Sequence, residues 1–484
     1  MSQQRRSPEA NLGLLDATMI GMGAMIGAGI FVLTGLAAEI AGPAAIVVFA
    51  LNGVVTAFTG LSYAELAASI PKSGGGYAYV RAVFDDFPSF LMGWMLWFAY
   101  MVAGTLYALG FAPNFVELLH VYDLSPAPDH LGAIAVPVLE VDVPALMALA
   151  FAAVLCLVAL NAVSTAASGS VETIFTVTKV SILFLFVGFG FTSASFSTAE
   201  FQPLFDDGAG AVSLLPAMGL TFIAFEGYDL ITTVTEEVEN PRENIPKAIF
   251  ASLVATVVVY LAVVVVAIGT LGADGLAAAG EAGIAEAATA FMPTGLPLIR
   301  NGGAIVVFGA VFSTLTALNA VVIASSRVAF AMGRERQLLP SFGQLHHRYG
   351  TPFVAILASA VVMLGAVVLP TASASNVSSL FFLVSFIVVN ASVIRLRRER
   401  PDMTRPYELP YYPVPPLVAI ALNLVLAGVL VRHLWRNDPL ALLLSVGWLV
   451  LGGIAYATLD TRRTPRDAGT TADGIEATPT SEDD

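Results

Sequence analysis

Twelve long apolar runs constrain this chain more than any other feature of its sequence. Each is close to the roughly 20 residues that an α-helix needs to cross a bilayer. Hydrophobic residues make up 57% of the 484 positions and charged residues only 12%, which is unlike a water-soluble domain. The sequence therefore predicts an all-α polytopic membrane protein with twelve transmembrane helices, at residues 12–41, 44–69, 87–117, 144–163, 168–192, 212–235, 248–271, 301–327, 352–370, 376–394, 413–433 and 440–459.

The basic residues are distributed unevenly between the segments that connect these spans. If the N-terminus is cytoplasmic, most of the 22 Lys and Arg residues fall on the cytoplasmic side, and the outer loops hold only Arg300, Arg432 and Arg436. Lys and Arg concentrate in the cytoplasmic loops of membrane proteins. Both termini are therefore predicted to be cytoplasmic. Residues 1–8 are too short and polar for a signal peptide, so residues 1–11 are predicted to be a cytoplasmic N-terminal segment. Residues 460–484 are predicted to form a disordered acidic tail.

The acidic balance of the chain bears on its habitat. The formal net charge is −14, and only Lys72, Lys179 and Lys247 are lysines. Acid-rich surfaces with few lysines suit a solvent of high ionic strength. The composition therefore predicts a halophilic source.

Glycines interrupt the first span. Residues 18–31 read TMIGMGAMIGAGIF and carry Gly21, Gly23, Gly27 and Gly29. Each glycine costs a helix on the order of 1 kcal/mol relative to alanine, so this cluster favours a break that exposes backbone amides and carbonyls. Exposed backbone at membrane depth is tolerated only where it is buried in protein or lines a wet cavity. A helix-packing face is the alternative, because Gly23 and Gly27 also form a GxxxG pair.

The sixth span carries a second interruption. Residues 221–229 read TFIAFEGYD and place Glu226, Gly227 and Asp229 in apolar sequence. A carboxylate inside a span is costly and marks a functional site by default. The two interruptions lie five spans apart, and because five is odd, the second set of five spans enters the membrane from the opposite side. This arrangement predicts an inverted-repeat transporter whose substrate lies between two discontinuous helices.

Four stretches of the chain resemble the amino acid, polyamine and organocation (APC) superfamily. The resemblance covers about residues 11–400, and within the superfamily the chain is similar to the bacterial and archaeal amino acid permeases and to the cationic amino acid transporters. The stretches are GLLDATMIGMGAMIGAGIFVLTG from Gly13, YAELAASIPKSGGGYAYV from Tyr63, FIAFEGYDLITTVTEEVENPRENIPKAI from Phe222 and SSRVAFAMGRERQLLP from Ser325.

The resemblance implies a leucine-transporter-type fold with discontinuous helices 1 and 6. Its core would be two inverted five-helix repeats, residues 12–192 and 212–396, followed by two peripheral helices in residues 413–459. The substrate carboxylate would bind backbone amides at the first break, where a half-helix N-terminus attracts anions. The substrate amino group would bind backbone carbonyls at the second break. The residues that this assigns to the substrate are Ile26, Gly27, Ala28, Gly29, Ile223, Ala224 and Phe225.

Phe225 and Glu226 each have more than one interpretation. Phe225 stands where the family often has an aromatic gate over the substrate, and ordinary packing is the alternative. Glu226 departs from the apolar residue usual at its position, and we include it among the substrate-binding residues. It could attract a cationic side chain or an amino group, act as a second proton carrier, or point to a neighbouring helix in its protonated form.

Lys179 is the only basic residue deep in a span. In the family's proton-coupled members, a lysine at this position of the fifth helix occupies the place of the sodium ion used by related symporters. The resemblance therefore favours proton coupling at Lys179, and a structural cation held by carbonyls of the first broken helix is the alternative. Sodium would need oxygen ligands such as the hydroxyls of Ser313 and Thr314, which can equally bond their own helix backbone.

The function predicted from the sequence is secondary active amino acid transport by alternating access, with proton symport favoured. An amino acid exchanger, a polyamine or organocation transporter and a non-transporting amino acid sensor are the alternatives. Neutral and cationic amino acids both remain open as substrates. An enzyme is not expected, because the five histidines form no metal-ligand pattern and no nucleophile accompanies a buried His and Asp. The expected partners are an amino acid, a proton and the lipid bilayer of the cell membrane, without cofactor, metal or nucleic acid.

Overall fold

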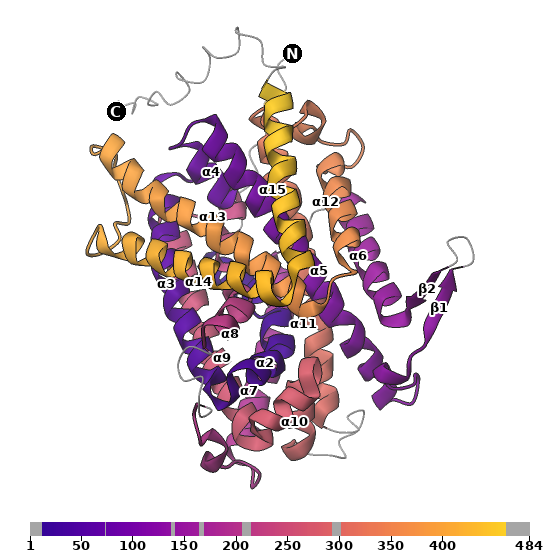
Figure 1. The fold of residues 1–484 in the computed structure, drawn as a ribbon. Coiled ribbons are helices and arrows are strands. Elements are labelled where there is room, and N and C mark those ends of the chain that lie inside the picture. The colour runs from indigo at the N-terminus through magenta and orange to yellow at the C-terminus, as the bar shows by residue number, and fades with distance from the viewer. Residues whose placement is uncertain are drawn as a thin grey trace.

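A computed structural model describes residues 12–72, 74–136, 141–163, 169–205, 214–292 and 302–460 (Figure 1). The predicted N-terminal segment 1–11 and residues 461–484 of the predicted tail lie outside the described residues. Helices dominate the described chain. The α-helices are α1 (Leu14–Met25), α2 (Ala28–Ala41), α3 (Ala45–Ser69), α4 (Gly75–Arg81), α5 (Asp86–Val121), α6 (Ala145–Val163), α7 (Gly169–Phe191), α8 (Leu214–Thr221), α9 (Pro241–Ala279), α10 (Gly283–Phe291), α11 (Gly302–Arg334), α12 (Phe353–Ala366), α13 (Thr371–Glu399), α14 (Val414–Asn437) and α15 (Pro439–Asp460).

Shorter elements fill the connections. One antiparallel hairpin lies between α5 and α6, with Ala133 opposite Pro144 and Ile134 opposite Val143. Its strands and the 3₁₀-helices are β1 (Ala133–Val136), β2 (Val141–Pro144), η1 (Gly42–Ala44), η2 (Pro128–His130), η3 (Thr198–Phe201), η5 (Phe222–Phe225), η6 (Tyr228–Glu237), η7 (Gly280–Ala282) and η8 (Pro340–Gly343).

Ten helical segments of the described chain are long and apolar enough to cross a membrane. The first, Leu14–Ser69, contains the two predicted spans 12–41 and 44–69. The predicted span 352–370 corresponds to the shorter helix α12, Phe353–Ala366. Each of the other predicted spans corresponds to one of the remaining segments. The described chain is therefore a polytopic helical bundle, as the apolar runs predict.

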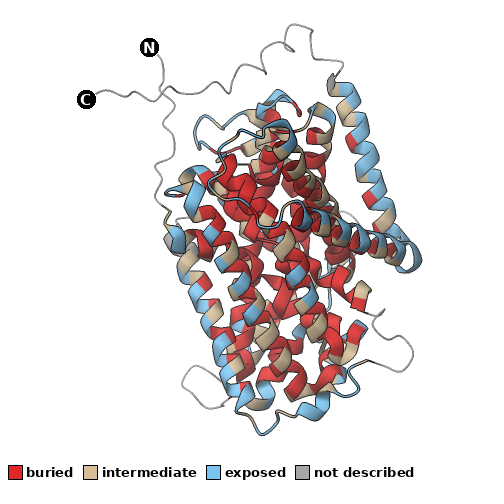
Figure 2. Ribbon diagram, turned by 90° about the vertical axis from the view of Figure 1, so that its left-hand side faces the viewer, coloured by how far each residue is buried: buried red, intermediate tan, exposed pale blue. Residues whose placement is uncertain are grey.

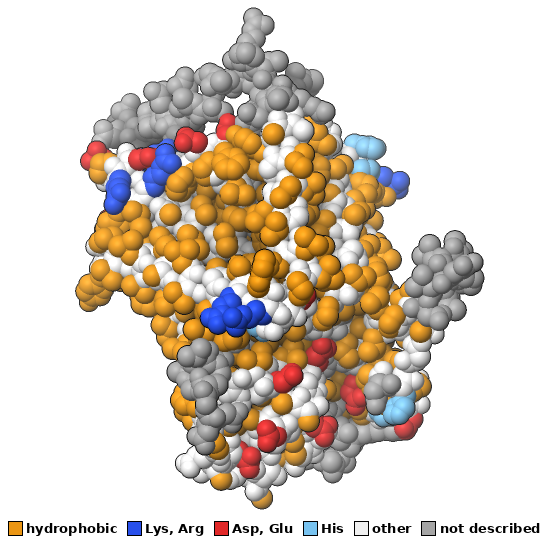
Figure 3. All heavy atoms as spheres, viewed as in Figure 1, with side chains coloured by type: hydrophobic (Ala, Val, Ile, Leu, Met, Phe, Trp, Pro, Cys, Tyr) orange, Lys and Arg blue, Asp and Glu red, His pale blue; other side chains and the backbone are white. Residues whose placement is uncertain are grey.

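The outside of the bundle is apolar as well as the inside. Buried residues fill the interior, and exposed ones lie on the outward faces of the helices (Figure 2). Many of the exposed residues are large and hydrophobic, such as Val361 at 71% and Leu443 at 66% exposure. On the face drawn in Figure 3, hydrophobic side chains cover most of the surface, and acidic side chains gather at the end where α10 lies. A hydrophobic surface this broad is expected of a protein that contacts lipid.

The predicted interruption of the first span is present. Helix α1 ends at Met25, and α2 begins at Ala28 after two non-helical residues. A Cβ atom added at Gly27 would lie 2.7 Å from the Cβ atom of Ala317 in α11, so this position accepts only glycine without rearrangement. Glycine at this position therefore permits the close approach of α11 to the backbone at the break.

The sixth span is also interrupted. Helix α8 gives way to η5 after Thr221, and η6 begins at Tyr228. Between the two 3₁₀-helices, Glu226 is extended and Gly227 has a φ of 139°, a backbone conformation that favours glycine. The glycine at this position therefore permits the sharp change of direction in the middle of the span.

Candidate functional site

The two interruptions contact each other in the interior of the bundle. A Cβ atom added at Gly29, in the first turn of α2, would lie 2.5 Å from the Cβ atom of Ala224 in η5. A Cβ atom at Gly227 would lie 2.6 Å from the backbone nitrogen of Met25. Non-bonded carbon atoms pack at about 3.5–4.0 Å, so glycine is what lets these backbones approach. The structure brings the residues of both breaks into one site.

Helix α2 directs its N-terminus into this site. Gly27 is the N-cap residue, and no side chain caps the helix. The amides of Ala28 and Gly29 belong to the first turn, where N–H groups have no acceptor within the helix. The partial positive charge of a helix N-terminus adds to the attraction of these donors for an anion. Together they form a site suited to a carboxylate.

Side chains from two other helices hold the carbonyl end of α1. Lys179 of α7 donates a hydrogen bond from Nζ to the carbonyl oxygen of Gly23 at 2.6 Å, and another to Oγ1 of Thr316 at 3.0 Å. Ser313 of α11 donates to the carbonyl oxygen of Ile26. Because a helix C-terminus carries partial negative charge, the ammonium group of Lys179 stabilises the broken end of α1. This contact is the one expected in the alternative interpretation of Lys179, in which carbonyls of the first broken helix hold a structural cation.

The hydroxyls considered as sodium ligands are engaged with backbone carbonyls. Thr314 donates to the carbonyl of Ala310 in its own helix at 2.8 Å. Ser313 donates to Ile26 across the break. Thr314 thus bonds its own helix backbone, as in the alternative predicted for it, and Ser313 bonds the backbone of the first broken helix. A donating hydroxyl keeps its oxygen lone pairs, so these bonds leave the oxygen atoms able to act as ligands.

Tyr260 of α9 joins the two breaks. Its hydroxyl oxygen lies 2.5 Å from the carbonyl oxygen of Met25 and 2.9 Å from that of Ala224. A tyrosine hydroxyl has a single proton to donate, so it serves one of these two acceptors at a time. The ring packs edge-on against Phe49 and Phe225, with centroids 5.9 and 5.3 Å away, which fixes the position of the hydroxyl.

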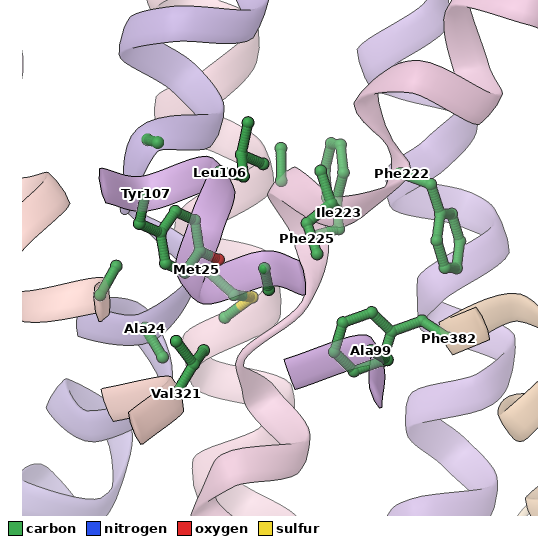
Figure 4. Packing of buried hydrophobic residues seen from close by; sticks show 14 of the residues in the cluster. Ala24, Met25, Ala99, Leu106, Tyr107, Phe222, Ile223, Phe225, Val321 and Phe382 are labelled. Carbon is green, nitrogen blue, oxygen red and sulfur yellow. The ribbon is translucent and has the colours of Figure 1, made fainter. Parts of the chain in front are cut away.

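The other predicted residues of the second break are already engaged. The carbonyl oxygen of Ile223 accepts a hydrogen bond from the N–H of Glu226 at 3.1 Å, and the N–H of Ile223 donates to Oγ of Ser379 at 3.1 Å. The ring of Phe225 packs against Tyr260 and does not line the cavity described next. In this structure Phe225 therefore has the packing role that we considered as its alternative. Figure 4 shows Ile223 and Phe225 close to Met25 of the first break.

A small cavity lies beside the two breaks. Ala24 of α1, Tyr107 of α5, Val321 of α11 and Phe382 of α13 belong to its lining, and Figure 4 shows the side chains of these residues around the site. Tyr107 would also contact a Cβ atom at Gly27, at 3.4 Å, so the cavity begins at the first break. Its space is comparable to that of about one water molecule. An amino acid needs more room, so the helices around the cavity must separate for it to enter.

Glu226 is the acidic member of this lining. Four charged residues are buried in the described part of the chain, namely Glu65, Lys179, Glu226 and Asp229. The carboxylate of Glu65 forms a two-point ion pair with Arg397, at 2.6 and 2.8 Å. Glu226 is 3% exposed, and neither of its carboxylate oxygens has a hydrogen-bond partner among the described residues. Among these four residues, Glu226 is the one whose charged group has no hydrogen bond within the described part of the chain.

Asp229 stabilises the second break. Its Oδ1 accepts a hydrogen bond from the N–H of Gly227 at 3.1 Å, and the hydroxyl of Tyr100 in α5 donates to its Oδ2. This bond ties the side chain of Asp229 to the backbone N–H of the residue two positions earlier. The carboxylate of Asp229 therefore fixes the conformation of Gly227, next to Glu226.

The broken helices are also tied together at the end where α1 begins. The N–H of Leu12 donates to the carbonyl of Glu237 at 3.0 Å, and the N–H of Glu239 donates to the carbonyl of Leu12 at 2.8 Å. Arg327 of α11 forms an ion pair with Glu237 at 3.3 Å and donates to the carbonyl of Thr233. These contacts close this end of the space between α1 and η6.

Neither Tyr260 nor Tyr100 was predicted from the sequence to belong to the site. Tyr260 lies in the run TVVVYLAVVVV, where it is the one side chain after the threonine that carries a hydroxyl. A polar group in an apolar span usually finds a specific partner, so this tyrosine was a detectable signal. Tyr100 lies in a run rich in aromatic residues, where its bond to Asp229 had no comparable signal.

The fold and the site together define a class of protein. Two interrupted helices meet in the interior of an apolar bundle, with free helix amides on one side and backbone carbonyls on the other. Broken helices with this arrangement bind the substrates of secondary transporters. The chain is a multi-pass membrane transporter.

Comparison with known proteins agrees with this class. The amino acid permease family matches residues 12–449, and the chain belongs to this family. It is 29% identical to the branched-chain amino acid permease BcaP of Bacillus subtilis over 93% of each chain. It is 28% identical to the methylthioribose transporter of the same bacterium, again over 93% of each chain. It is also 26% identical to the serine/threonine exchanger SteT of Bacillus subtilis, over 86% of this chain and 90% of that protein.

Proposed function

We propose that this amino acid permease is a proton-coupled symporter that works by alternating access. The observation that carries the proposal is the meeting of the two breaks, where the uncapped N-terminus of α2 faces the carbonyl groups held by Tyr260. An amino acid has a carboxylate for the amides and an ammonium group for the carbonyls. A substrate bound in this way occupies the interior of the bundle and separates the two ends of the pathway.

The arrangement of the spans belongs to this proposal. Membership of the amino acid permease family implies a leucine-transporter-type fold, with residues 12–192 and 212–396 as inverted repeats and 413–459 as two peripheral helices. The excess of Lys and Arg in the segments that would be cytoplasmic supports cytoplasmic termini. In that orientation, the contacts of Leu12 and Arg327 with Glu237 close the cytoplasmic end of the pathway and must open for release.

The substrate head group is assigned to the backbone of both breaks. Residues 26–29 of the first break bind its carboxylate, and the amides of Ala28 and Gly29 are the donors with the clearest geometry. Residues 223–225 of the second break bind its amino group, with the carbonyl of Ala224 as the principal acceptor. The ammonium group can donate three hydrogen bonds, so it provides a donor for the carbonyl oxygen that the single proton of Tyr260 does not reach. Glu226 in the adjoining cavity faces the substrate side chain.

Lys179 is the proposed site of proton coupling. Its Nζ links α7 to the carbonyl of Gly23, one turn before the break in α1. Protonation strengthens this link, because the charge interacts with the negative end of the helix. Deprotonation weakens the link and frees α1 to move against α7. Coupling thus follows from a contact whose strength depends on the proton and which lies next to the carboxylate site.

Amino acid exchange is the second candidate function. One of the similar proteins is described as a serine/threonine exchanger, which supports exchange as an alternative to symport. A polyamine has no carboxylate and would leave the amides of α2 unused, so this class ranks behind amino acids. A non-transporting sensor would bind an amino acid at the same breaks without carrying it across the membrane.

The test is uptake of a labelled amino acid panel into proteoliposomes in sodium-free buffer, with an imposed inward proton gradient. The wild type should accumulate substrate in response to the gradient, and Lys179→Ala should lose this response while still exchanging amino acids. Lys247→Ala is the matched control, because Lys247 pairs with Glu243 on the exposed surface. Wild-type uptake that ignores the proton gradient but requires amino acid inside the vesicles identifies an exchanger and refutes symport.

A further inference from the structure

We propose that Glu226 selects substrates with a cationic side chain, whose charged group enters the cavity beside the two breaks and pairs with this carboxylate. The inference rests on the proposed function, in which the two breaks bind the head group of an amino acid. It adds the residue that binds the side chain of the same substrate. It concerns the class of amino acid that the site prefers.

The carboxylate of Glu226 is buried and has no hydrogen-bond partner among the described residues. Its residue is 3% exposed, both oxygens are buried, and the described residues offer neither oxygen a hydrogen bond. The three other buried charged residues have such partners, as with Glu65 and Arg397 or Asp229 and Tyr100. Buried ionisable groups are ordinarily paired or hydrogen-bonded. A buried carboxylate that the protein leaves unpartnered beside a binding site is therefore placed to accept a group that the ligand brings.

The charged side chains around the two breaks do not balance one another. Lys179 contacts the end of α1, and Glu226 and Asp229 flank Gly227 in the second break. When all three groups are ionised, they leave one negative charge uncompensated. A zwitterionic amino acid has no net charge and cannot balance it. An amino acid with a cationic side chain supplies the missing positive charge, which removes the cost of burying an unpaired carboxylate.

The carboxylate of Glu226 lies next to the site proposed for the head group. Glu226 follows Ala224 by two residues, and the cavity that it lines begins at Gly27 of the first break. A head group held between α2 and Ala224 therefore directs its side chain toward this cavity. Ala103 of α5 and Ala317 of α11 belong to the lining, and their small side chains offer little obstruction to an extended chain once the helices separate.

The apolar part of the cavity fits the same class of side chain. Leu230, Val321 and Phe382 contribute hydrophobic surface around Glu226. Long cationic side chains place an aliphatic stem on apolar surface and direct the charged end to a polar partner. An apolar amino acid would fill the same surface but would bury Glu226 without a donor. The lining thus distinguishes substrates by whether they bring a positively charged donor to this one carboxylate.

The experiment compares arginine with citrulline, which has nearly the same shape but a neutral ureido group in place of the guanidinium. Each compound competes with counterflow of a labelled amino acid that the protein carries, in proteoliposomes containing wild type, Glu226→Gln or Asp229→Asn. The wild type should bind arginine on the order of tenfold or more tightly than citrulline, because hydrogen bonds between charged groups are strong. Glu226→Gln keeps the shape of the side chain and should abolish the preference.

Asp229→Asn is the matched control, since it removes the second buried carboxylate of the break. Asp229 is already bonded to Tyr100 and Gly227, so this change removes one negative charge of the break but keeps the carboxylate that pairs with the substrate. The preference for arginine should therefore fall only partly in Asp229→Asn, whereas Glu226→Gln abolishes it. The ratio within one variant is insensitive to how much protein folds.

Three results would overturn the inference. The wild type could bind citrulline as well as arginine, or Glu226→Gln could lower the affinity for both equally. Glu226→Gln could instead keep the ratio and remove the response to a proton gradient, which would identify Glu226 as a proton carrier. Counterflow of neutral amino acids without an arginine preference refutes only this inference, whereas no counterflow with any amino acid refutes the proposed function.

Discussion

Replacing Gly29 by alanine tests the contact between the two breaks. The new Cβ atom would lie 2.5 Å from the Cβ and 2.7 Å from the Cα atom of Ala224. Carbon atoms pack at about 3.5–4.0 Å, so α2 and η5 must separate by about 1 Å to accept one methyl group. Gly29 is in the first turn of α2, so this movement displaces the amides assigned to the substrate carboxylate.

The expected magnitude follows from this displacement. An overpacked site costs about 1–3 kcal/mol of folding free energy, and the better helix propensity of alanine returns at most about 1 kcal/mol. The effect on binding is larger, because a hydrogen bond stretched by about 1 Å is lost. Hydrogen bonds to a charged group contribute about 1.5–3 kcal/mol, so the KM of transport should rise roughly ten- to hundredfold.

The assay is the concentration dependence of amino acid counterflow in proteoliposomes, together with thermal unfolding in detergent. Gly428→Ala is the control, because a Cβ atom at Gly428 of α14 would meet no atom within 4 Å. Gly428→Ala should leave KM at the wild-type value and should not lower the unfolding temperature, which the better helix propensity of alanine raises slightly. If Gly29→Ala transports with an unchanged KM, the carboxylate does not bind at the start of α2, and our assignment is wrong.

Two further substitutions test other parts of the site and fold. Tyr260→Phe keeps the packed ring but removes the hydroxyl that the two breaks share. The contact with Ala224 then loses about 1 kcal/mol, which should raise KM several-fold in the same counterflow assay. An unchanged KM contradicts the role of the hydroxyl. Glu65→Gln removes the buried charge paired with Arg397 and should lower stability by about 2 kcal/mol and the unfolding temperature with it, whereas Glu243→Gln on the exposed surface should not. Equal unfolding temperatures for the two variants would contradict a structural role for Glu65.

The interruptions could be predicted because each has a strong local cause. Glycines and a carboxylate in apolar sequence oppose a continuous helix, so the breaks at Gly27 and Gly227 appear in the residue pattern itself. The spans follow in the same way from the length of the apolar runs. The exception is α12, which ends at Ala366 and is followed by a turn, so the helix is shorter than its apolar run.

What the pattern could not predict is how side chains meet across helices that are distant in sequence. Tyr260 is 235 residues from Met25, and no local rule relates the two. The same holds for Tyr100 and Asp229, which are 129 residues apart. Whether Glu226 faces a cavity or a neighbouring helix also depends on this packing, which the residue pattern does not contain. Glu226 belongs to the cavity lining, and both the binding of a cationic group and the carrying of a proton stay predictions for it.

The most direct test of the central claim is the structure of the protein in lipid nanodiscs, determined by cryo-electron microscopy with a saturating concentration of a transported amino acid. Our account predicts density between the two breaks, with the carboxylate against the amides of Ala28 and Gly29 and the amino group against the carbonyl of Ala224. Substrate density at any other place, with these amides and this carbonyl left as they are now, would contradict it.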